Sequence, residues 1–214
     1  MLLMKVVFNL LQCQRNAPLR ALVLLGGLLL IVGIFPSVAH AQTSYFTPRT
    51  ILAEFFPRSQ AVSFERFDLT AEQRQKLTEV LGYTPRKPSY TIYIAKTGDQ
   101  IDGYAIIDEE KGQHLPITFA VQFDAKGAVK RQELMVYRER YGDEIRDARF
   151  RQQFVGKHVK SPLREGEEII AISGATISSR AMVIGVRRAL VLLDELVLKR
   201  PMKQPDTAKA IPSS

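Results

Sequence analysis

The sequence has few of the residues on which common functional sites depend. It holds one cysteine, no tryptophan and three histidines among 214 residues. A single cysteine excludes an internal disulfide and a thiolate metal cluster, and His114 and His158 lack the partner spacing that a metal site needs. No Ser-His-Asp arrangement with its supporting context is present. The pattern therefore predicts neither a metal site nor a hydrolytic triad.

Long apolar runs are also scarce, and residues 21–35 form the only one. This scarcity excludes a polytopic membrane protein. The flanks of the run carry the basic, helix-breaking and small residues of a secretory signal, namely Lys5, Arg15, Arg20, Pro36, Ala39 and Ala41. Either residues 1–41 are a signal cleaved after Ala41, or residues 21–38 remain as a membrane anchor. Both alternatives predict that residues 42–214 are periplasmic.

The formal net charge of +8 is concentrated at the two ends of the chain. Residues 1–41 and residues 199–214 each carry an excess of three cations, which leaves +2 for residues 42–198. The basic excess therefore belongs to export and to a Pro-containing tail that we expect to be disordered. No nucleic-acid partner is predicted. Cys13 leaves with the signal, and a thiol-free exported part suits an oxidising compartment.

The central part of the chain predicts an α+β fold. Start and stop signals bound two short helices within residues 42–88, with Thr47, Pro48 and Pro57 for the first and Thr70, Gln73 and Gly82 for the second. Alternating or β-branched segments predict strands at residues 62–67, 90–96, 101–107, 115–123 and 128–137. Hairpin-length turns between them predict an antiparallel sheet of about four to five strands. Glu109-Glu110-Lys111 is interpreted as a solvated turn.

The carboxyl-terminal part predicts helices. Residues 143–154 form an amphipathic helix in this interpretation, and residues 167–172 form a short buried strand. A long helix follows from about Thr176 to Lys199, and we expect it to pack on the sheet through apolar positions at helical spacing, namely Val183, Val186, Leu190, Leu193 and Val197. The predicted organisation is a signal or anchor (1–41), an amino-terminal segment (42–88), a main domain (89–198) and a tail (199–214).

The most informative stretch is Ser173-Gly174-Ala175-Thr176, with Ser179 close behind, at the start of the long helix. A helix amino terminus offers free N–H groups and the positive end of the helix dipole, which favour a phosphate. Gly174 permits a sharp turn, and the hydroxyls add donors. The same residue types are also common at ordinary helix starts. The spacing alone leaves both interpretations open.

This stretch resembles the flavinylation motif of the FMN-binding domain family. A second stretch supports the resemblance, since Tyr137-Arg-Glu-Arg-Tyr-Gly-Asp-Glu144 and the following Gln153-Phe-Val-Gly-Lys157 are similar to the family's strand-end acid, tight turn and QF-x-GK segment. The family includes the C subunit of the sodium-pumping NADH:quinone reductase, the G subunit of the Rnf complex and the periplasmic domain of the nitrous-oxide-reductase regulator. The acid–Thr–Pro–Gly turn of the first two is absent here, which argues against either identity. The resemblance covers about residues 89–198.

The resemblance implies FMN as cofactor, joined by a phosphoester to Thr176. A flavin transferase would make this bond and read the neighbouring residues, and the implied cofactor-binding set is Ser173, Gly174, Ala175, Thr176, Ser179, Glu139, Tyr141 and Gly142. The chain would then be an exported flavoprotein that relays electrons between redox partner proteins at the membrane or in the periplasm, rather than a stand-alone enzyme. The alternatives are a non-covalent FMN-binding sensor or regulatory module at the membrane, and a structural exported α+β adaptor without flavin.

The roles of several side chains stay open in the sequence. Tyr137 and Tyr141 suit either stacking on a flavin or packing at a sheet edge. Glu139 and Glu144 suit an acid/base pair, or surface ion pairs with Arg138 or Arg140. We also hypothesise that a cation, Arg180 or Lys157, lies near the pyrimidine edge of the flavin and favours its reduced anion.

Overall fold

The structure is a computed structural model that describes residues 42–200, so the predicted signal or anchor and most of the predicted tail lie outside the described residues. Within this range, no helix combines the length and apolarity that a membrane span requires. The elements follow in the order β1 (Thr43–Ser44), α3 (Pro48–Phe55), β2 (Ala61–Asp68), α4 (Ala71–Leu81), β3 (Ser89–Thr97), β4 (Gln100–Lys111), β5 (Pro116–Asp124), β6 (Val129–Tyr137), η1 (Asp143–Arg146), α5 (Ala148–Gln152), α6 (Thr176–Leu193) and η2 (Asp194–Leu198).

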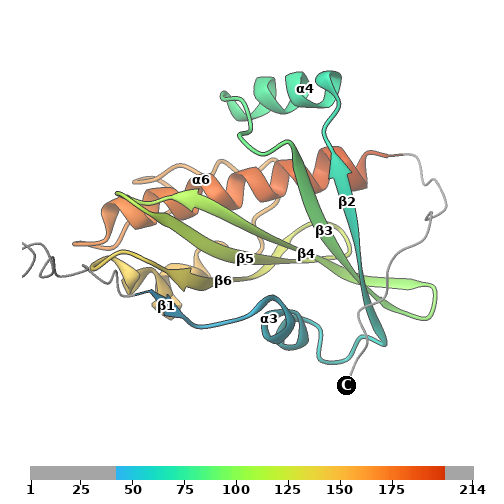
Figure 1. The fold of residues 1–214 in the computed structure, drawn as a ribbon, viewed down its shortest axis with the longest axis horizontal. Coiled ribbons are helices and arrows are strands. Elements are labelled where there is room, and N and C mark those ends of the chain that lie inside the picture. The colour runs from blue at the N-terminus through green and yellow to red at the C-terminus, as the bar shows by residue number, and fades with distance from the viewer. Residues whose placement is uncertain (1–41, 201–214) are drawn as a thin grey trace, which may run out of the picture. The chain divides into compact units, whose positions relative to one another are not determined.

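The six strands form one antiparallel sheet in the order β1-β6-β5-β4-β3-β2 (Figure 1). The predicted α+β class and antiparallel pairing are confirmed, but the sheet has six strands rather than four to five. The additional strand is β1, in which Thr43 pairs with Tyr137 and Ser44 with Val136 of β6. Two residues are too few to show an alternation of polar and apolar side chains. Thr43 and Ser44 form a strand only because they pair with the edge of β6.

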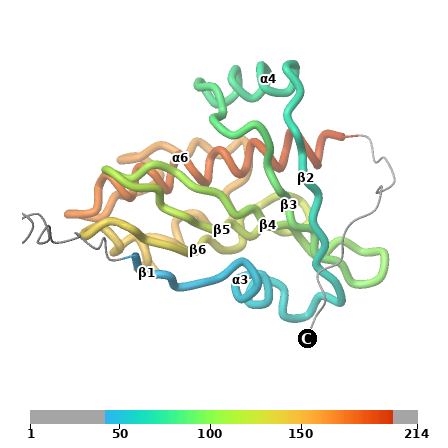
Figure 2. Tube along the Cα trace, in the orientation of Figure 1, coloured from blue at the N-terminus to red at the C-terminus, as the bar shows by residue number. Residues whose placement is uncertain are grey.

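The sheet separates two apolar layers, because successive side chains of a strand point to opposite faces. In β5, Phe119, Val121 and Phe123 face the larger layer, which α4 and α6 cover. Ala120 faces the smaller layer, where α3 packs. Figures 1 and 2 show α6 running along one side of the sheet and α3 lying on the other. The amino-terminal strands β1 and β2 therefore belong to the same sheet as β3 to β6, and α3 and α4 pack on its two opposite faces.

The helix boundaries follow the local signals closely. Thr47 forms a capping box with Thr50 and precedes Pro48, and α3 ends before Pro57. Thr70 forms a capping box with Gln73. Gly82 ends α4 in the left-handed conformation at φ +80°. These predictions are confirmed, since each depends on hydrogen bonds within four residues.

The long carboxyl-terminal helix is also confirmed. It consists of α6, followed without a break by the π-helical turn η2. Val183, Val186, Leu190 and Leu193 are buried against the sheet as predicted. Gly185 lies in the middle of α6, where a Cβ would overlap the ring of Phe119, 2.6 Å from its Cε1. Glycine at this position therefore lets the helix approach β5 closely.

We predict that Gly185→Val lowers the free energy of unfolding by about 1–3 kcal/mol, since a larger side chain must displace the ring of Phe119. Urea unfolding followed by circular dichroism measures the change. Ile184→Val, at the exposed neighbouring position, is the matched control and should change stability by less than about 0.5 kcal/mol. Equal stability of the Gly185→Val and wild-type proteins would contradict the close packing.

Two predicted elements are wrong. Residues 167–172 are not a strand, because only an isolated bridge joins Glu165 to Ile169 and the side chain of Ile170 is 70% exposed. The predicted helix over residues 143–154 is interrupted at Asp147, whose ψ of 134° ends η1. The carboxylate of Asp147 accepts from the Arg149 N–H at 2.7 Å and begins α5. In both places, hydrogen bonds between residues close in the sequence replace the strand or helix hydrogen bonds that were expected.

The predicted solvated turn at residues 109–111 is also wrong. Glu109, Glu110 and Lys111 form the last residues of β4, and they pair with Thr118, Ile117 and Pro116 of β5. Glu109 and Glu110 form ion pairs with neighbouring elements. Arg188 of α6 lies against Asp108 and Glu110 on one face, and Arg138 lies against Glu109 on the other.

Candidate functional site

The amino terminus of α6 is formed by a tight turn. The Ala175 N–H donates to the carbonyl of Ile172 at 3.0 Å, and Gly174 has φ +85°, as the third position of a type II turn requires. The N-cap residue is Ala175, and no side chain caps the helix. Thr176 is the first helical residue rather than a capping hydroxyl. The first N–H groups of this 18-residue helix therefore have no side-chain acceptor.

The four hydroxyls of this segment divide into two classes. Ser178 and Ser179 are buried, with 5% and 0% of their surface exposed. Ser178 bonds the hydroxyl of Tyr137 at 2.8 Å, and Ser179 Oγ accepts from the Ile172 N–H at 3.1 Å. Ser173 and Thr176 are exposed. A ligand that arrives from solvent at the helix terminus therefore meets Thr176 and Ser173, while the other two hydroxyls hold the backbone in place.

The loop that leads into the turn is clasped by a side-chain amide. Gln153 donates to the Ile170 carbonyl at 3.1 Å, and its oxygen accepts from the Ile170 N–H at 2.7 Å. Together with the Ser179 bond to Ile172, this clasp fixes the loop at two points. Gln153 belongs to the QF-x-GK stretch, but the sequence did not assign it to the site. A side-chain amide can donate to and accept from the same backbone residue. This capacity for two hydrogen bonds is the signal in the sequence that would have identified Gln153.

The rest of the QF-x-GK stretch joins the same loop to the sheet. Phe154 is fully buried and packs edge-on against Phe150. Gly156 donates to the carbonyl of Val129, and the Val129 N–H donates to the carbonyl of Lys157, both at 2.8 Å. The stretch therefore positions the helix terminus from the side of β6.

The second predicted segment, the turn at residues 138–142, lies against the first turn of α6. The Tyr137 hydroxyl donates to the Tyr141 carbonyl at 2.5 Å and bonds Ser178 Oγ at 2.8 Å, so one buried phenol joins the turn to the helix. Gly142 has φ +104°, and a Cβ there would lie 2.5 Å from the Tyr137 oxygen and 2.6 Å from Ser178 Oγ. Only glycine fits both the backbone and the space.

The two tyrosines of this turn have different roles. Tyr137 is buried, and burial raises the pKa of its phenol, so the hydroxyl stays protonated and available as a donor. The side chain of Tyr141 is 74% exposed, and the Arg140 guanidinium lies 5.4 Å from its ring centroid. The Tyr141 ring is therefore exposed on the turn beside Arg140, while Tyr137 packs and holds the turn.

Glu139 supports a neighbouring loop instead of forming the ion pair expected with Arg138 or Arg140. Its Oε1 accepts from the backbone N–H groups of His114 at 2.7 Å and Leu115 at 3.1 Å. Glu139 therefore fixes the β4–β5 hairpin beside the turn. Arg138 donates to the Pro116 carbonyl and Thr118 hydroxyl, both at 2.8 Å.

The two cations predicted near a ligand are differently placed. Arg180 is exposed and forms an ion pair with Glu165 at 2.7 Å. This hydrogen bond raises the pKa of Arg180, so the guanidinium stays charged. Lys157 is half-buried, and its backbone carbonyl pairs with Val129. Their proximity to a flavin ring stays a prediction.

Tyr45, directly after β1, holds the η1 helix that follows the 138–142 turn, a contribution that the sequence did not reveal. The Tyr45 N–H donates to the Met135 carbonyl at 2.8 Å, and its hydroxyl donates to Asp143 at 2.9 Å. The Arg146 guanidinium stacks over the Tyr45 ring at 3.7 Å from the centroid. Tyr45 therefore ties η1, which follows Gly142 directly, to the edge of the sheet.

We predict that Tyr45→Phe costs about 1 kcal/mol of unfolding free energy, since it removes one hydrogen bond and keeps the ring under Arg146. Amide hydrogen exchange should accelerate in residues 138–147 more than elsewhere. Tyr93→Phe, in the smaller apolar layer, is the matched control and should leave exchange at 138–147 unchanged. Unaltered exchange in Tyr45→Phe would contradict this role of Tyr45.

The predicted residues are thus partly brought together. Ser173, Gly174, Ala175 and Thr176 form the helix terminus, Gly142 contacts Ser178 in its first turn, and Ser179 lies beneath it. Glu139 faces the β4–β5 hairpin. Within residues 42–200, no three His, Asp or Glu side chains gather in a geometry that could hold a metal ion.

Comparison with known proteins identifies a family for this part of the chain. Residues 112–191 match the sequence model of the FMN-binding domain. No curated protein matches the chain.

Two solved structures share a coarse likeness with the chain. NqrC of Shewanella oneidensis is 16% identical, with 65% of this chain and 80% of that chain covered and a TM-score of 0.39. The corresponding protein of the Na(+)-translocating NADH-quinone reductase from Parabacteroides distasonis ATCC 8503 is also 16% identical, with 67% and 84% covered and a TM-score of 0.40. The family match spans β5, β6, the 138–142 turn and most of α6. Residues 112–191 therefore match the FMN-binding domain family, and this match indicates FMN as the cofactor.

Proposed function

We propose that this protein is an exported flavoprotein that relays electrons, with FMN attached through a phosphoester to Thr176. The observation that carries the proposal is an exposed threonine hydroxyl at an uncapped helix terminus, within a segment that matches the FMN-binding domain. An uncapped terminus offers N–H donors and a positive dipole end to a phosphate.

The residues present fit FMN in three respects. The space beside Gly174 is open, because a Cβ there would meet no atom within 4 Å. Thr176 and Ser173 are exposed, whereas the buried Ser178 and Ser179 are already bonded. The aromatic face of Tyr141 lies on the turn that Tyr137 joins to the first helical turn. A phosphate, its attachment oxygen and a planar ring each have a suitable neighbour.

Each part of the site has its own role in this proposal. The first N–H groups of α6 bind the phosphate, and the Thr176 hydroxyl provides the oxygen of the phosphoester. Gln153, Ser179 and Tyr137 hold the loop, the turn and the helix in register. Bound FMN supplies reversible electron transfer, and the chain supplies attachment and orientation.

A flavin transferase and redox partner proteins complete the proposed function. A flavin transferase forms the phosphoester and reads Ser173, Gly174 and Ala175, two of which are exposed at the turn. Redox partner proteins at the membrane or in the periplasm deliver and remove electrons. A covalent tether prevents loss of the flavin outside the cytoplasm, in keeping with the secretory pattern of residues 1–41.

The full chain, expressed in a bacterial host with and without a flavin transferase, tests this function. With the transferase, we expect a denatured gel band that fluoresces as flavin, and an intact mass that equals residues 42–214 plus one FMN phosphoester. Without the transferase the band should be dark. A protein that is yellow when native but loses its colour on denaturation would overturn covalent attachment. A protein that never acquires flavin absorbance would overturn FMN binding itself.

A further inference from the structure

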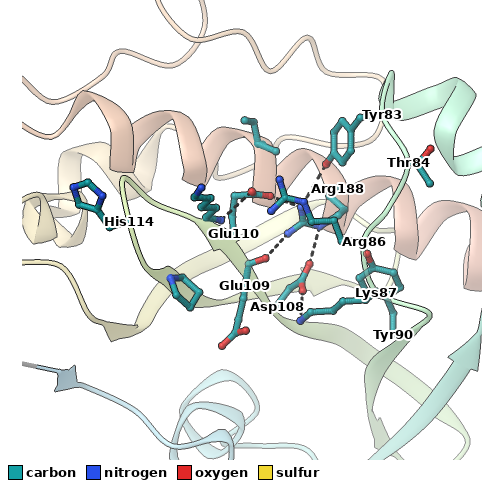
Figure 3. A pocket seen from close by; sticks show the side chains of 13 residues that line it. Tyr83, Thr84, Arg86, Lys87, Tyr90, Asp108, Glu109, Glu110, His114 and Arg188 are labelled. Atoms are coloured by element: carbon teal, nitrogen blue, oxygen red, sulfur yellow. Dashed lines mark hydrogen bonds and ion pairs between the residues drawn. The ribbon is translucent and has the colours of Figure 1, made fainter. Parts of the chain in front are cut away.

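A pocket lies away from the amino terminus of α6, on the face of the sheet that α6 covers. It has a volume of about 580 Å³, within the range of small-molecule sites. The β3 approach, the end of β4, the β4–β5 hairpin and α6 form its walls (Figure 3). Tyr83, Tyr90, Pro116 and Ile184 supply its apolar surface. The pocket is therefore large enough for a molecule with an apolar body of aromatic size.

The floor of this pocket is a buried and internally neutralised charge network. Arg188 is 6% exposed, and its Nε donates to the carboxylate of Asp108, 1% exposed, at 2.7 Å. Its other nitrogens donate to the carboxylate of Glu110 and, at 2.8 Å, to the Glu109 carbonyl. Lys87 also donates to Asp108 at 2.7 Å. Figure 3 shows these groups directed toward one another, so the floor leaves little charge for a ligand.

The mouth of the pocket differs from the floor, since its cations have no carboxylate partner. Arg86 and Lys111 are both exposed, and neither forms an ion pair within the described part of the chain. His114 adds an imidazole at the β4–β5 hairpin end of the pocket, whereas Arg86 lies toward the opposite end (Figure 3). The carboxylate of Glu109 does not compensate for them, since it accepts from Thr118 and lies near Arg138 on the opposite face. Arg86 and Lys111 therefore add two cations without an ion pair to a pocket that also has an apolar wall.

We propose that this pocket binds a small organic anion, with its apolar body between Tyr83 and Ile184 and its carboxylate or phosphate at Arg86 and Lys111. The arrangement matches the usual design of ligand sites, in which apolar walls supply contact area and a few charged groups fix orientation. The site is separate from Thr176, since Ile184 and Arg188 lie eight and twelve residues farther along α6, about 12 and 18 Å by helical rise.

The β4–β5 hairpin connects this pocket to the 138–142 turn through hydrogen bonds. His114 lines the pocket, and its backbone N–H is held by Glu139 of the 138–142 turn. The two sites therefore share one support.

Three probes in titrations of the flavin-loaded protein test the proposal. 2-Naphthoate has an apolar body and a carboxylate, 2-naphthamide has the same body without charge, and inorganic phosphate has charge without the body. We expect saturable 2-naphthoate binding, with amide chemical-shift changes at residues 83–90, 108–116 and 184–188. 2-Naphthamide should bind at least about ten-fold more weakly, which corresponds to 1.4 kcal/mol, and phosphate should not saturate.

Variants separate the mouth from general surface charge. Arg86→Gln and Lys111→Gln should each weaken 2-naphthoate binding about three- to ten-fold, whereas Lys126→Gln, an exposed lysine on the β5–β6 turn, should leave it unchanged. Ile184→Glu should abolish binding, and its melting temperature should stay near that of wild type because the side chain is partly exposed. Equal affinity for the naphthoate and the amide, or shifts outside these residues, would overturn the proposal. Binding that occurs only in the flavin-free Thr176→Val protein would overturn a separate site, while leaving flavin attachment intact.

Discussion

Thr176→Val is expected to abolish covalent flavin attachment. Valine keeps the shape and β-branching of threonine at the first helical position but removes the oxygen that the phosphoester requires. Co-expressed with a flavin transferase and then denatured, the wild-type chain should give a fluorescent band and the Thr176→Val chain a dark one. Thr176→Ala should give the same result. The far-ultraviolet circular dichroism of both variants should match that of wild type, because Thr176 is exposed and caps nothing.

Neighbouring hydroxyls provide the controls for this result. Ser173→Ala removes the other exposed hydroxyl and should leave the adduct on Thr176, even where the transferase acts more slowly. Peptide mapping locates the adduct, since trypsin releases residues 165–180 as one peptide with the whole motif. Fluorescence that persists in Thr176→Val and maps to Ser173 would show that the flavin is attached to Ser173 instead of Thr176.

Arg188→Met is expected to produce the largest loss of stability, about 3–5 kcal/mol of unfolding free energy. The change leaves Asp108 and Glu110 without their shared guanidinium partner, and Asp108 is 1% exposed. Removing one member of a buried ion pair is costly, because the remaining charge stays in a poorly solvated place. Lys87 keeps one bond to Asp108, which directs the expected loss toward the lower end of this range. Urea unfolding measures the difference.

Two further proteins show whether the charge network is the cause. Arg187→Met, at the exposed adjacent position, loses one bond to the Val80 carbonyl and should cost no more than about 1 kcal/mol. The triple variant Asp108→Leu, Glu110→Gln, Arg188→Met should recover much of the loss, since apolar replacement of a buried ion pair is often neutral. A triple variant as unstable as the single one would indicate that Arg188 acts through packing alone.

Local signals predict the structure correctly wherever their partners lie within a few residues. The capping boxes at Thr47 and Thr70, the left-handed Gly82 and the apolar stripe of α6 follow from backbone hydrogen bonds and helical period. The alternation in β3 to β6 likewise predicts the antiparallel hairpins. The strand expected at residues 167–172 is absent because its apolar pair has no neighbouring strand, and Gln153 and Arg164 satisfy its backbone instead.

The sequence by itself determined the α+β class, the motif at Ser173–Thr176, its place at a helix start and the uneven charge of the chain. Each of these depends on composition or on short-range periodicity. The tertiary structure alone decided that Thr176 is exposed while Ser178 and Ser179 are buried, and that Tyr137 joins the 138–142 turn to α6. It also placed Arg188 between two carboxylates of β4, about eighty residues earlier in the chain. Burial and long-range pairing depend on which elements pack together, and no local pattern encodes that choice.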